Sequence, residues 1–174
     1  HVAMSNLKHL KYEWIWVKPN GTGFLNANKA PLKAHENILV FYNKPPKYNP
    51  QMRSGFAPYV NHRGRCSTNY HPFGDWITES NGDRFPIDVL YYDREPNNIH
   101  PTQKPVALVE YLIRTYTNQG DIILDNCIGS GTTAIAAIRN NRKFIGYEIN
   151  AEYYKQAIKR IDIESMQKPL FFDG

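Results

Sequence analysis

Residues 125–133 read Asp-Asn-Cys-Ile-Gly-Ser-Gly-Thr-Thr, and this segment decides the fold. It follows a short apolar stretch, Ile122-Ile123-Leu124, which is typical of a buried strand, and it leads into Thr132–Arg139, which is typical of a helix. Glycine at positions 129 and 131 removes the Cβ atom, so the backbone can turn sharply and a ligand can approach it closely. A glycine loop between a strand and a helix favours a nucleotide-type binding site.

The neighbouring segments continue the same alternation of strands and helices. Apolar residues recur at helical spacing after Pro105 and predict a helix that ends near Gly120. Lys143–Glu148 predicts a strand, and Asn150 is the expected N-cap of a last helix that runs to about Ser165. Alternating strands and helices with short connections are typical of a parallel, doubly wound sheet, so we expect an α/β fold.

Two acidic residues indicate what the loop could bind. Glu148 lies 19 residues after Gly129, an offset at which a carboxylate can accept the hydroxyl groups of a ribose. Asp125 starts the loop, where an acid would repel a pyrophosphate but would suit a cationic amine. S-adenosylmethionine carries both a ribose and such an amine.

Other interpretations of the loop differ in the residues that they require. A phosphate-binding loop of the Gly-x-x-x-x-Gly-Lys-Ser/Thr type is excluded, because no lysine follows Gly131. A dinucleotide fingerprint has a third glycine where this chain has Ala134, which the looser form of the fingerprint allows. A glycine pair that shapes the turn without binding a ligand also stays open.

The first half of the chain predicts strands and an insertion. Tyr12–Val17 and Asn37–Tyr42 are rich in aromatic and β-branched residues; we expect the first strand to end in a turn at Lys18–Gly21 and the second to be buried on both faces. Residues 44–86 are rich in Pro, Asn, Gly and Tyr and have no sustained period, which predicts an irregular, functional insertion. A short strand over Asp88–Tyr92 closes it.

Charge is unevenly distributed along the 174 residues, which carry a net charge of +5. Residues 1–74 hold ten Lys and Arg against two Glu, whereas residues 75–174 hold eleven Lys and Arg against fourteen acidic residues. No acidic residue occurs from Asn37 to Gly74. Segregated positive charge favours a polyanionic partner, and nucleic acid is the leading candidate.

Composition argues against several other classes of protein. No apolar run approaches the roughly 18 residues of a membrane span, and no stretch of signal-peptide length is present, so we expect a cytoplasmic protein without membrane contact. Cys66 and Cys127 have no Cys-x-x-Cys partner and are expected to be free thiols. His62, His71 and His100 lack metal-ligand spacing, so no metal site is expected.

A second motif, His100-Pro101-Thr102-Gln103-Lys104-Pro105, comes just before the helix that precedes the glycine loop. Together with residues 125–133 and Phe144–Glu148, it resembles the β-class DNA amino-methyltransferases, which methylate adenine N6 or cytosine N4. The resemblance implies an α/β, Rossmann-like S-adenosylmethionine-dependent methyltransferase fold, here partial, with an irregular target-recognition insert. It also implies S-adenosylmethionine as the cofactor, with Thr102 and Lys104 on its methionine carboxylate.

The resemblance implies an organisation in three parts and a set of cofactor-binding residues. Residues 1–43 would be strands of the catalytic domain, residues 44–86 the target-recognition insert, and residues 87–174 the cofactor-binding half. The implied cofactor-binding residues come from the three motifs and are His100, Thr102, Gln103, Lys104, Asp125, Cys127, Gly129, Ser130, Gly131, Thr132, Thr133, Glu148 and Ile149.

The resemblance extends upstream, where Tyr12–Lys18, Ala34–Asn37 and Arg84–Pro86 look like segments that flank the family's target-recognition region. Trp14 and Trp16 alternate with smaller apolar residues, so we expect one indole to face the core and the other to face a site. The expected DNA-binding residues are basic, with one aromatic, and are Trp16, Lys18, Lys44, Lys47, Arg53, Arg63 and Arg65.

The family's catalytic tetrapeptide, Asp/Ser/Asn-Pro-Pro-Tyr/Phe, is missing from this sequence. The pair Pro45-Pro46 is preceded by Lys44 and followed by Lys47, so no catalytic residue is assigned in this chain. We expect a bacterial or phage-encoded methyltransferase of duplex DNA, with adenine N6 favoured over cytosine N4. A truncated, non-catalytic remnant that binds DNA or cofactor and a methyltransferase of RNA stay open, as does pairing into a homodimer.

Overall fold

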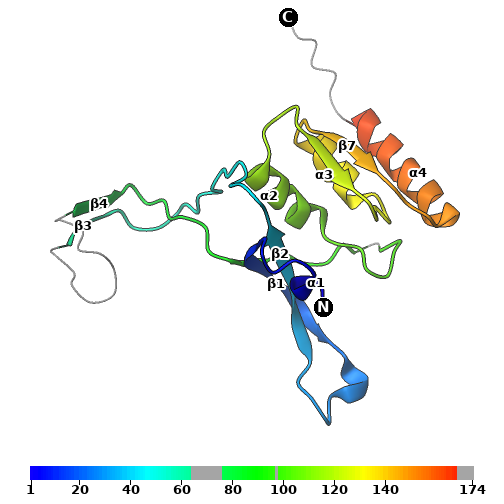
Figure 1. The fold of residues 1–174 in the computed structure, drawn as a ribbon, viewed down its shortest axis with the longest axis horizontal. Helices are drawn as coiled ribbons and strands as arrows, with labels where there is room; N and C mark the ends of the chain where they lie inside the picture. Colours follow the sequence, from blue (N-terminus) through cyan, green and yellow to red (C-terminus); the bar gives the residue numbers. More distant parts are fainter. Residues whose placement is uncertain (64–75, 97, 168–174) are drawn as a thin grey trace, which may run out of the picture. The chain divides into compact units, whose positions relative to one another are not determined.

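The computed structural model describes residues 1–63, 76–96 and 98–167. The chain divides into two compact units, one from residues 1–49 and 88–174 and the other from residues 50–87. The elements, most of them labelled in Figure 1, are α1 (Val2–Ser5), β1 (Leu10–Thr22), the 3-10 helix η1 (Phe24–Asn26), β2 (Lys33–Phe41), β3 (Tyr59–Arg63), β4 (Trp76–Ser80), β5 (Val89–Tyr91), α2 (Val106–Tyr116), β6 (Ile122–Asp125), α3 (Thr132–Arg139), β7 (Lys143–Gly146) and α4 (Ala151–Gln167). None of the described helices is long and apolar enough to cross a membrane.

The first unit contains a three-stranded sheet in the order β2-β1-β5. β1 pairs antiparallel with β2 and parallel with β5, so the sheet is mixed. Trp14, Trp16 and Lys18 are two residues apart on β1 and therefore share one face, where all three are buried. The strand register places Trp16 opposite Glu36 of β2 and opposite Leu90 of β5.

Two expectations about these strands are wrong, and the structure refines a third. β1 does not end in a turn at Lys18–Gly21, because it continues to Thr22 through a shift in register after Val17. Trp14 and Trp16 point to the same face of β1, because residues two apart on a strand point the same way; both are buried, and Trp16 also lines a cavity. β2 is not buried on both faces, because it is an edge strand and its residues are exposed or half-buried.

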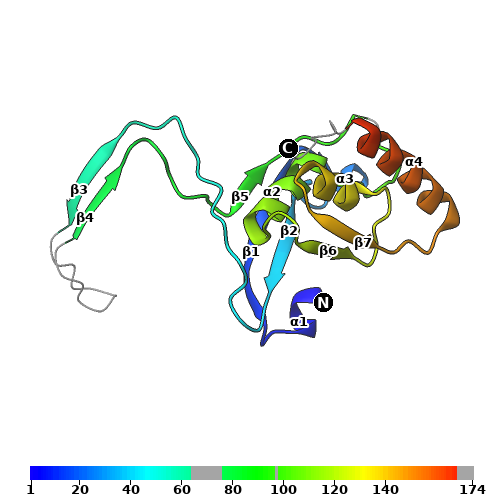
Figure 2. The same ribbon diagram turned by 90° about the horizontal axis from the view of Figure 1, so that it is seen from above.

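The second sheet of this unit is the parallel pair β6 and β7. Ile123 and Phe144 lie opposite each other in this pair and pack on an apolar cluster supplied by α2 and α3. Figure 2 shows α2 and α3 on one side of β6 and β7. The buried members of the cluster are Val106, Ile113, Ile135, Ala136 and Ala137. These elements confirm the predicted alternation of helix and strand between Pro105 and Asn150.

Helix α2 packs against both sheets. Val106 and Ile113 belong to the cluster with α3, whereas Leu108 belongs to a second cluster with Trp14 and Trp16 of β1. The helix is therefore apolar on two faces, and each face covers a different sheet. The position of α2 fixes the segment that precedes it relative to both sheets.

Side chains cap the helices near the glycine loop. Asn150 caps α4 as predicted, since its Oδ1 accepts the backbone N–H groups of Glu152 at 2.9 Å and Tyr153 at 3.1 Å. Glu95 accepts the N–H of Val106 at 2.9 Å and so satisfies a free donor at the start of α2. A carboxylate is also favoured there by the helix dipole.

The described strands of the first unit do not form the single doubly wound sheet that the alternation predicts. β6 and β7 pair with each other and stay separate from the β2-β1-β5 sheet. One face of the pair is covered by helices, while the other carries the exposed side chains of Ile122, Leu124 and Ile145. Parallel sheets are ordinarily covered on both faces, so this open apolar face departs from the usual arrangement.

Residues 50–87 are more regular than predicted. β3 and β4 form an antiparallel pair whose register starts with Tyr59 opposite Ser80. Arg84 supports this pair, because it donates to the carbonyl of Ala57 at 2.7 Å and its guanidinium lies 4.5 Å from the ring centroid of Tyr59. The sequence did not predict this strand pair, because β3 and β4 have little of the apolar alternation that marks a half-buried strand.

Replacing Ile135 by alanine should destabilise the fold strongly. The side chain is 2% exposed in the cluster beneath α2, so its removal leaves a cavity and should lower the free energy of unfolding by about 2–5 kcal/mol. Ile122→Ala is the matched control, because Ile122 is 62% exposed and a surface change should cost only about 0.5 kcal/mol. Urea unfolding followed by circular dichroism measures both; equal losses would contradict the described core.

Acid should weaken the contact between α3 and α4. Arg139 donates to the two carboxylate oxygens of Glu164 at 2.7 and 2.8 Å, and this hydrogen bond outweighs burial and holds the pKa of Glu164 below its ordinary value of 4.5. A lowered pKa adds stability that is present above the unfolded value and is lost as the pH falls through the folded value. Wild type should therefore exceed Glu164→Gln in free energy of unfolding at pH 7, and the gap should shrink below pH 4.5.

The control for this pH effect is Arg139→Gln, which removes the other partner of the same ion pair. It should show the same shrinking gap to wild type in urea unfolding at successive pH values. A gap that stays constant from pH 7 into acid, for either variant, would show that the ion pair does not contribute as described.

Candidate functional site

The glycine loop starts at a carboxylate that the loop itself holds in place. Asp125 Oδ1 accepts the N–H of Cys127 at 3.0 Å, and Asp125 Oδ2 accepts the hydroxyl of Thr133 at 2.6 Å. An ionised carboxylate has about four lone-pair positions, so about two remain for a ligand. Asp125 is therefore fixed in orientation and still able to accept hydrogen bonds.

Glu148, two residues after the neighbouring strand β7, is held in the same way. Its Oε2 accepts the N–H of Gly129 at 2.9 Å, and its Oε1 accepts the N–H of Asn150 at 2.8 Å. The N–H of Tyr147 donates to the carbonyl of Asp125 at 2.9 Å and joins the ends of the two strands. The two acids that the sequence analysis singled out thus lie at the same edge of the β6–β7 sheet.

Helix α4 supports the loop from the other side. Gly131 has a φ of +79°, which favours glycine, and a Cβ there would lie 3.4 Å from the Cβ of Ala157. Arg160 Nη1 donates to the carbonyl of Ser130 at 3.2 Å and to the hydroxyl of Thr132 at 3.3 Å. No sequence pattern pointed to Arg160, because it reaches the loop from a separate helix.

The segment 100–105 folds into a turn beside the glycine loop. His100 Nδ1 lies 3.0 Å from Thr102 Oγ1, and the ring packs edge-on against Tyr153 of α4 with the ring centroids 4.3 Å apart. Gln103 Oε1 accepts the N–H of Ile99 at 3.2 Å. The two motifs, separated in sequence by all of α2 and β6, come together in one place.

Two cavities adjoin along this arrangement and share Cys127, whose thiol is free and whose residue is exposed. The first, of about 340 Å³, is lined by Asn126, Cys127, Tyr147, Glu148 and Ile149. The second, of about 190 Å³, is lined by His100, Thr102, Gln103, Lys104, Val109, Asp125, Cys127, Ile128, Gly129, Ser130, Thr132 and Thr133. Of the expected cofactor-binding residues, Gly131 alone lines neither cavity, since it packs on Ala157. The lining residues that the sequence analysis missed are Asn126, Tyr147, Val109 and Ile128.

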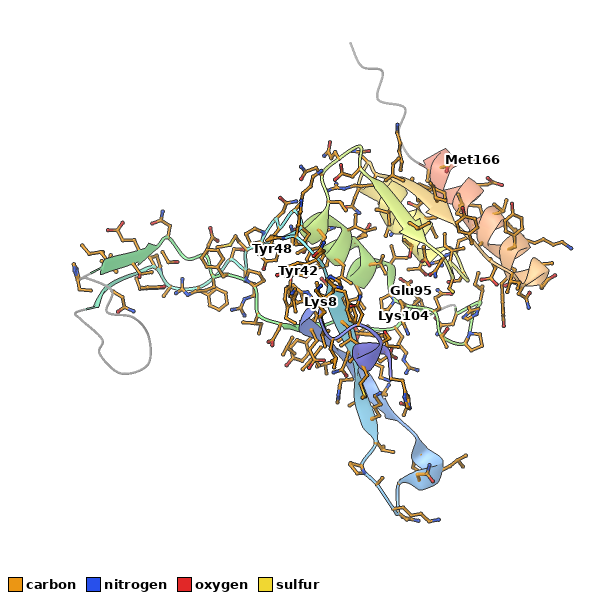
Figure 3. The ribbon with its side chains drawn as sticks, in the orientation of Figure 1. Lys8, Tyr42, Tyr48, Glu95, Lys104 and Met166 are labelled. Carbon is orange, nitrogen blue, oxygen red and sulfur yellow. The ribbon has the colours of Figure 1, made fainter. Side chains whose placement is uncertain are left out.

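A third cavity, also of about 190 Å³, shares Thr102, Gln103 and Lys104 with the second. Its other lining residues come from β1, β2 and the segment before α2, and are Trp16, Lys18, Thr22, Glu36, Arg94, Asn98 and Pro101. The side chain of Lys104, labelled in Figure 3, therefore borders both the cavity of the glycine loop and the cavity of the β1–β2 sheet.

Glu36 forms two ion pairs at this junction. Its carboxylate lies 2.7 Å from Nζ of Lys104 and 3.5 Å from Nζ of Lys18. Burial opposes its charge, but the hydrogen bond and charge of Lys104, together with the charge of Lys18, hold the pKa of Glu36 below its ordinary value. No sequence pattern pointed to Glu36 as part of the site, because its partners lie on other elements.

Trp16 and Lys18, two of the expected DNA contacts, lie among the lining residues of the third cavity. Trp16 is 2% exposed, and its indole N–H donates to the carbonyl of Tyr92 at 2.9 Å. Lys18 is 5% exposed and faces Glu36. Both belong to the buried face of β1, and their expected contact with DNA stays a prediction.

Lys47 is also engaged inside the first unit. Its Nζ donates to the two carboxylate oxygens of Asp121 at 2.9 and 2.7 Å. This hydrogen bond is the main reason that the pKa of Asp121 lies below its ordinary value. The charge of Lys47 is thus matched by an acid of the second half of the chain.

The other expected DNA contacts differ in what the structure describes. Lys44 and Arg53 are exposed, and Arg53 Nε donates to the carbonyl of Phe85 at 3.2 Å. Arg63 is the last residue of β3, and Arg65 lies outside the described residues. Within the described ranges, no three His, Cys, Asp or Glu side chains gather as metal ligands would.

A family model for N6 and N4 methyltransferases, described as DNA methylase, matches residues 2–159, which is most of the chain. The chain belongs to the N6/N4 DNA methylase family. The match runs through both sheets of the first unit, both motifs of the site and residues 50–87. It confirms the resemblance to the β-class amino-methyltransferases.

Two curated relatives illustrate the similarity within this family. The chain is 36% identical over 148 residues to the type II methyltransferase M.BglII of Bacillus subtilis, and 52% identical over 163 residues to the type II methyltransferase M1.MboII of Moraxella bovis. The matches cover 80% and 83% of this chain, but only 38% and 60% of those two relatives. The chain therefore spans about two-fifths to three-fifths of their length.

A solved structure extends the comparison to the fold. The crystal structure of the M1.HpyAVI–SAM complex superimposes with a TM-score of 0.56 at 27% sequence identity, covering 88% of this chain and 62% of that chain. The chain thus has part of a Rossmann-like methyltransferase fold, which confirms the expected fold class.

Proposed function

We propose that this chain is the cofactor-binding part of an S-adenosylmethionine-dependent DNA amino-methyltransferase. The observation that carries the proposal is the pair of adjoining cavities at the glycine loop, one with Glu148 and the other with Asp125. The relative M1.HpyAVI, solved as a SAM complex, supports the choice of cofactor.

The chemistry of the lining residues fits S-adenosylmethionine. The cavity of Glu148 is bordered by Tyr147 and Ile149, which suits an adenosine whose base is apolar on its faces and whose ribose carries two hydroxyl groups. The cavity of Asp125 has an acid for the cationic amine, and it has Lys104 at its border for the carboxylate of the methionine part. Opposite charges are thus available for the ammonium and the carboxylate of the methionine part.

The chain's own residues would orient the cofactor rather than take part in bond making. Glu148 and Asp125 accept hydrogen bonds from positions that are already fixed by the loop backbone. Such preorganised groups lose little freedom on binding, so they favour a single bound geometry. When bound, S-adenosylmethionine supplies the methyl group on its sulfonium.

We infer that the methyl acceptor is an exocyclic amine of duplex DNA, with adenine N6 favoured over cytosine N4. The family's description as DNA methylase and the excess of Lys and Arg over acids in residues 1–74 support DNA as the substrate. Residues 50–87, with Arg53, would belong to the target-recognition insert. The Asp/Ser/Asn-Pro-Pro-Tyr/Phe segment, which this sequence lacks, would have to come from another segment or chain.

Isothermal titration should detect S-adenosylmethionine binding to this chain. Glu148→Ala should raise the dissociation constant by about tenfold or more, the equivalent of about 1.4 kcal/mol, because a charged acceptor for the ribose is lost. Glu152→Ala is the matched control, since Glu152 is an exposed acid in the first turn of α4, four residues after Glu148. Thermal unfolding of both variants reports any loss of fold. If wild type shows no binding, or Glu148→Ala binds as tightly as wild type, the cofactor assignment is wrong.

Methyl transfer should require the part of the family enzyme that this chain does not match. We expect this chain alone to be inactive. A fusion to the part of M1.MboII that lies outside the matched 60% should transfer labelled methyl groups from S-adenosylmethionine to duplex DNA. Hydrolysis of the DNA and chromatography of the labelled base distinguish N6-methyladenine from N4-methylcytosine.

The controls for the fusion are the same protein with Glu148→Ala and a duplex RNA substrate. DNA methylation that falls with Glu148→Ala supports the proposal, and N4-methylcytosine as product would overturn the preference for adenine. A fusion that binds S-adenosylmethionine but methylates neither nucleic acid would favour a non-catalytic remnant. Transfer to RNA in preference to DNA would contradict the proposed substrate.

A further inference from the structure

Glu36 connects the β1–β2 sheet to the cofactor segment 100–105. It lies on β2 opposite Trp16, so its side chain shares the face that also carries Lys18. From there it accepts the Lys104 ammonium at 2.7 Å, a partner that lies 68 residues away in the chain. This ion pair joins a residue of the sheet to the segment that borders the glycine-loop cavity.

The sheet also determines where the side chain of Lys104 lies. Besides the bond to Glu36, the Lys104 Nζ lies 5.7 Å from the ring centroid of Trp16, within the range of a cation–π contact. The backbone of Lys104 is held separately, since its carbonyl accepts the hydroxyl of Thr132 at 3.4 Å. The backbone thus belongs to the glycine-loop region, whereas the ammonium is placed by β1 and β2.

Lys18 keeps the Glu36 carboxylate charged and in position. The Lys18 side chain is 3% exposed, and its Nζ lies 3.5 Å from Glu36 and 3.4 Å from the hydroxyl of Thr22. A buried ammonium needs a counter-charge, so it favours an ionised Glu36 that stays on this face. One carboxylate between two ammonium groups leaves a net positive charge beside the cavity.

We propose that Glu36 is a positioning residue for cofactor binding: it holds Lys104 where the ammonium can meet the carboxylate of the methionine part of S-adenosylmethionine. This inference rests on the proposed function. Glu36 itself does not line the glycine-loop cavity and acts through Lys104. Its contribution therefore applies to ligands that carry the amino-acid carboxylate.

Two ligands separate this role from general support of the fold. S-adenosylhomocysteine and 5′-methylthioadenosine share an adenosine and a thioether, but only the first carries the amino-acid part. Titration of the full chain should show that Glu36→Gln lowers the affinity for S-adenosylhomocysteine by about three- to tenfold, the range expected when a charge-assisted contact is lost. The same variant should leave the affinity for 5′-methylthioadenosine unchanged.

A double-mutant cycle tests whether Glu36 acts through Lys104. If it does, Lys104→Gln should lower the affinity for S-adenosylhomocysteine at least as much as Glu36→Gln does. Adding Glu36→Gln to Lys104→Gln should then cause no further loss of affinity. Glu13→Gln is the matched control, because Glu13 is an exposed acid of β1 that accepts a hydrogen bond from Asn37 on β2. It should change neither affinity.

The outcomes separate this inference from the proposed function. If wild type binds neither S-adenosylmethionine nor S-adenosylhomocysteine, the proposed function fails and the positioning role fails with it. If wild type binds both and Glu36→Gln is unchanged, only the positioning role fails. An equal loss of affinity for 5′-methylthioadenosine, or additive losses of affinity in the double variant, would show that Glu36 supports the fold instead. Thermal unfolding would then show the corresponding loss of stability.

Discussion

The packing of α2 against two different sheets is the constraint on which the geometry of the site depends. Its Val106 and Ile113 are buried with α3, while its Leu108 is buried with the tryptophans of β1. A helix held on two faces can neither rotate nor shift without opening one of the two cores. The segment 100–105, which leads directly into this helix, is therefore fixed relative to both the glycine loop and the β1–β2 sheet. Lys104 can border two cavities for this reason.

The polar groups of the site are likewise held in fixed positions by their neighbours. Asp125 and Glu148 are oriented by N–H groups of the loop itself, and Arg160 holds the loop from α4. In the described part of the chain, no buried polar side-chain atom lacks a hydrogen-bond partner. The acids and the loop therefore hold their places without a ligand, which reduces the cost of ordering on binding. Lys104 differs, because its ammonium is placed by Glu36 rather than by the loop.

Features encoded by local sequence could be predicted, and features that depend on distant partners could not. The glycine loop, the helix after it and the Asn150 cap follow from neighbouring residues, and all three are present. The division into two sheets and the register of β1 on β2 depend on which strands meet, and local periodicity does not contain that information. The roles of Glu36 and Arg160 were missed for the same reason. The shared face of Trp14 and Trp16 is different, since the two-residue period of a strand already predicts it.

The ion pairs show that part of the positive charge in the first half of the sequence is already matched by acids of the same chain. Lys18 is buried against Glu36, and Lys47 is paired with Asp121 from the acidic half of the chain. A formal count over residues 1–74 thus overstates the charge that a phosphate backbone could meet, because counterion release depends on cations that contact phosphates. Other cations of this half are exposed: Lys8, Lys11, Lys29 and Lys33 lie on the first unit, and Lys44 and Arg53 lie just before or in residues 50–87. The basic half of the sequence therefore combines cations that are paired within the first unit with cations that remain exposed.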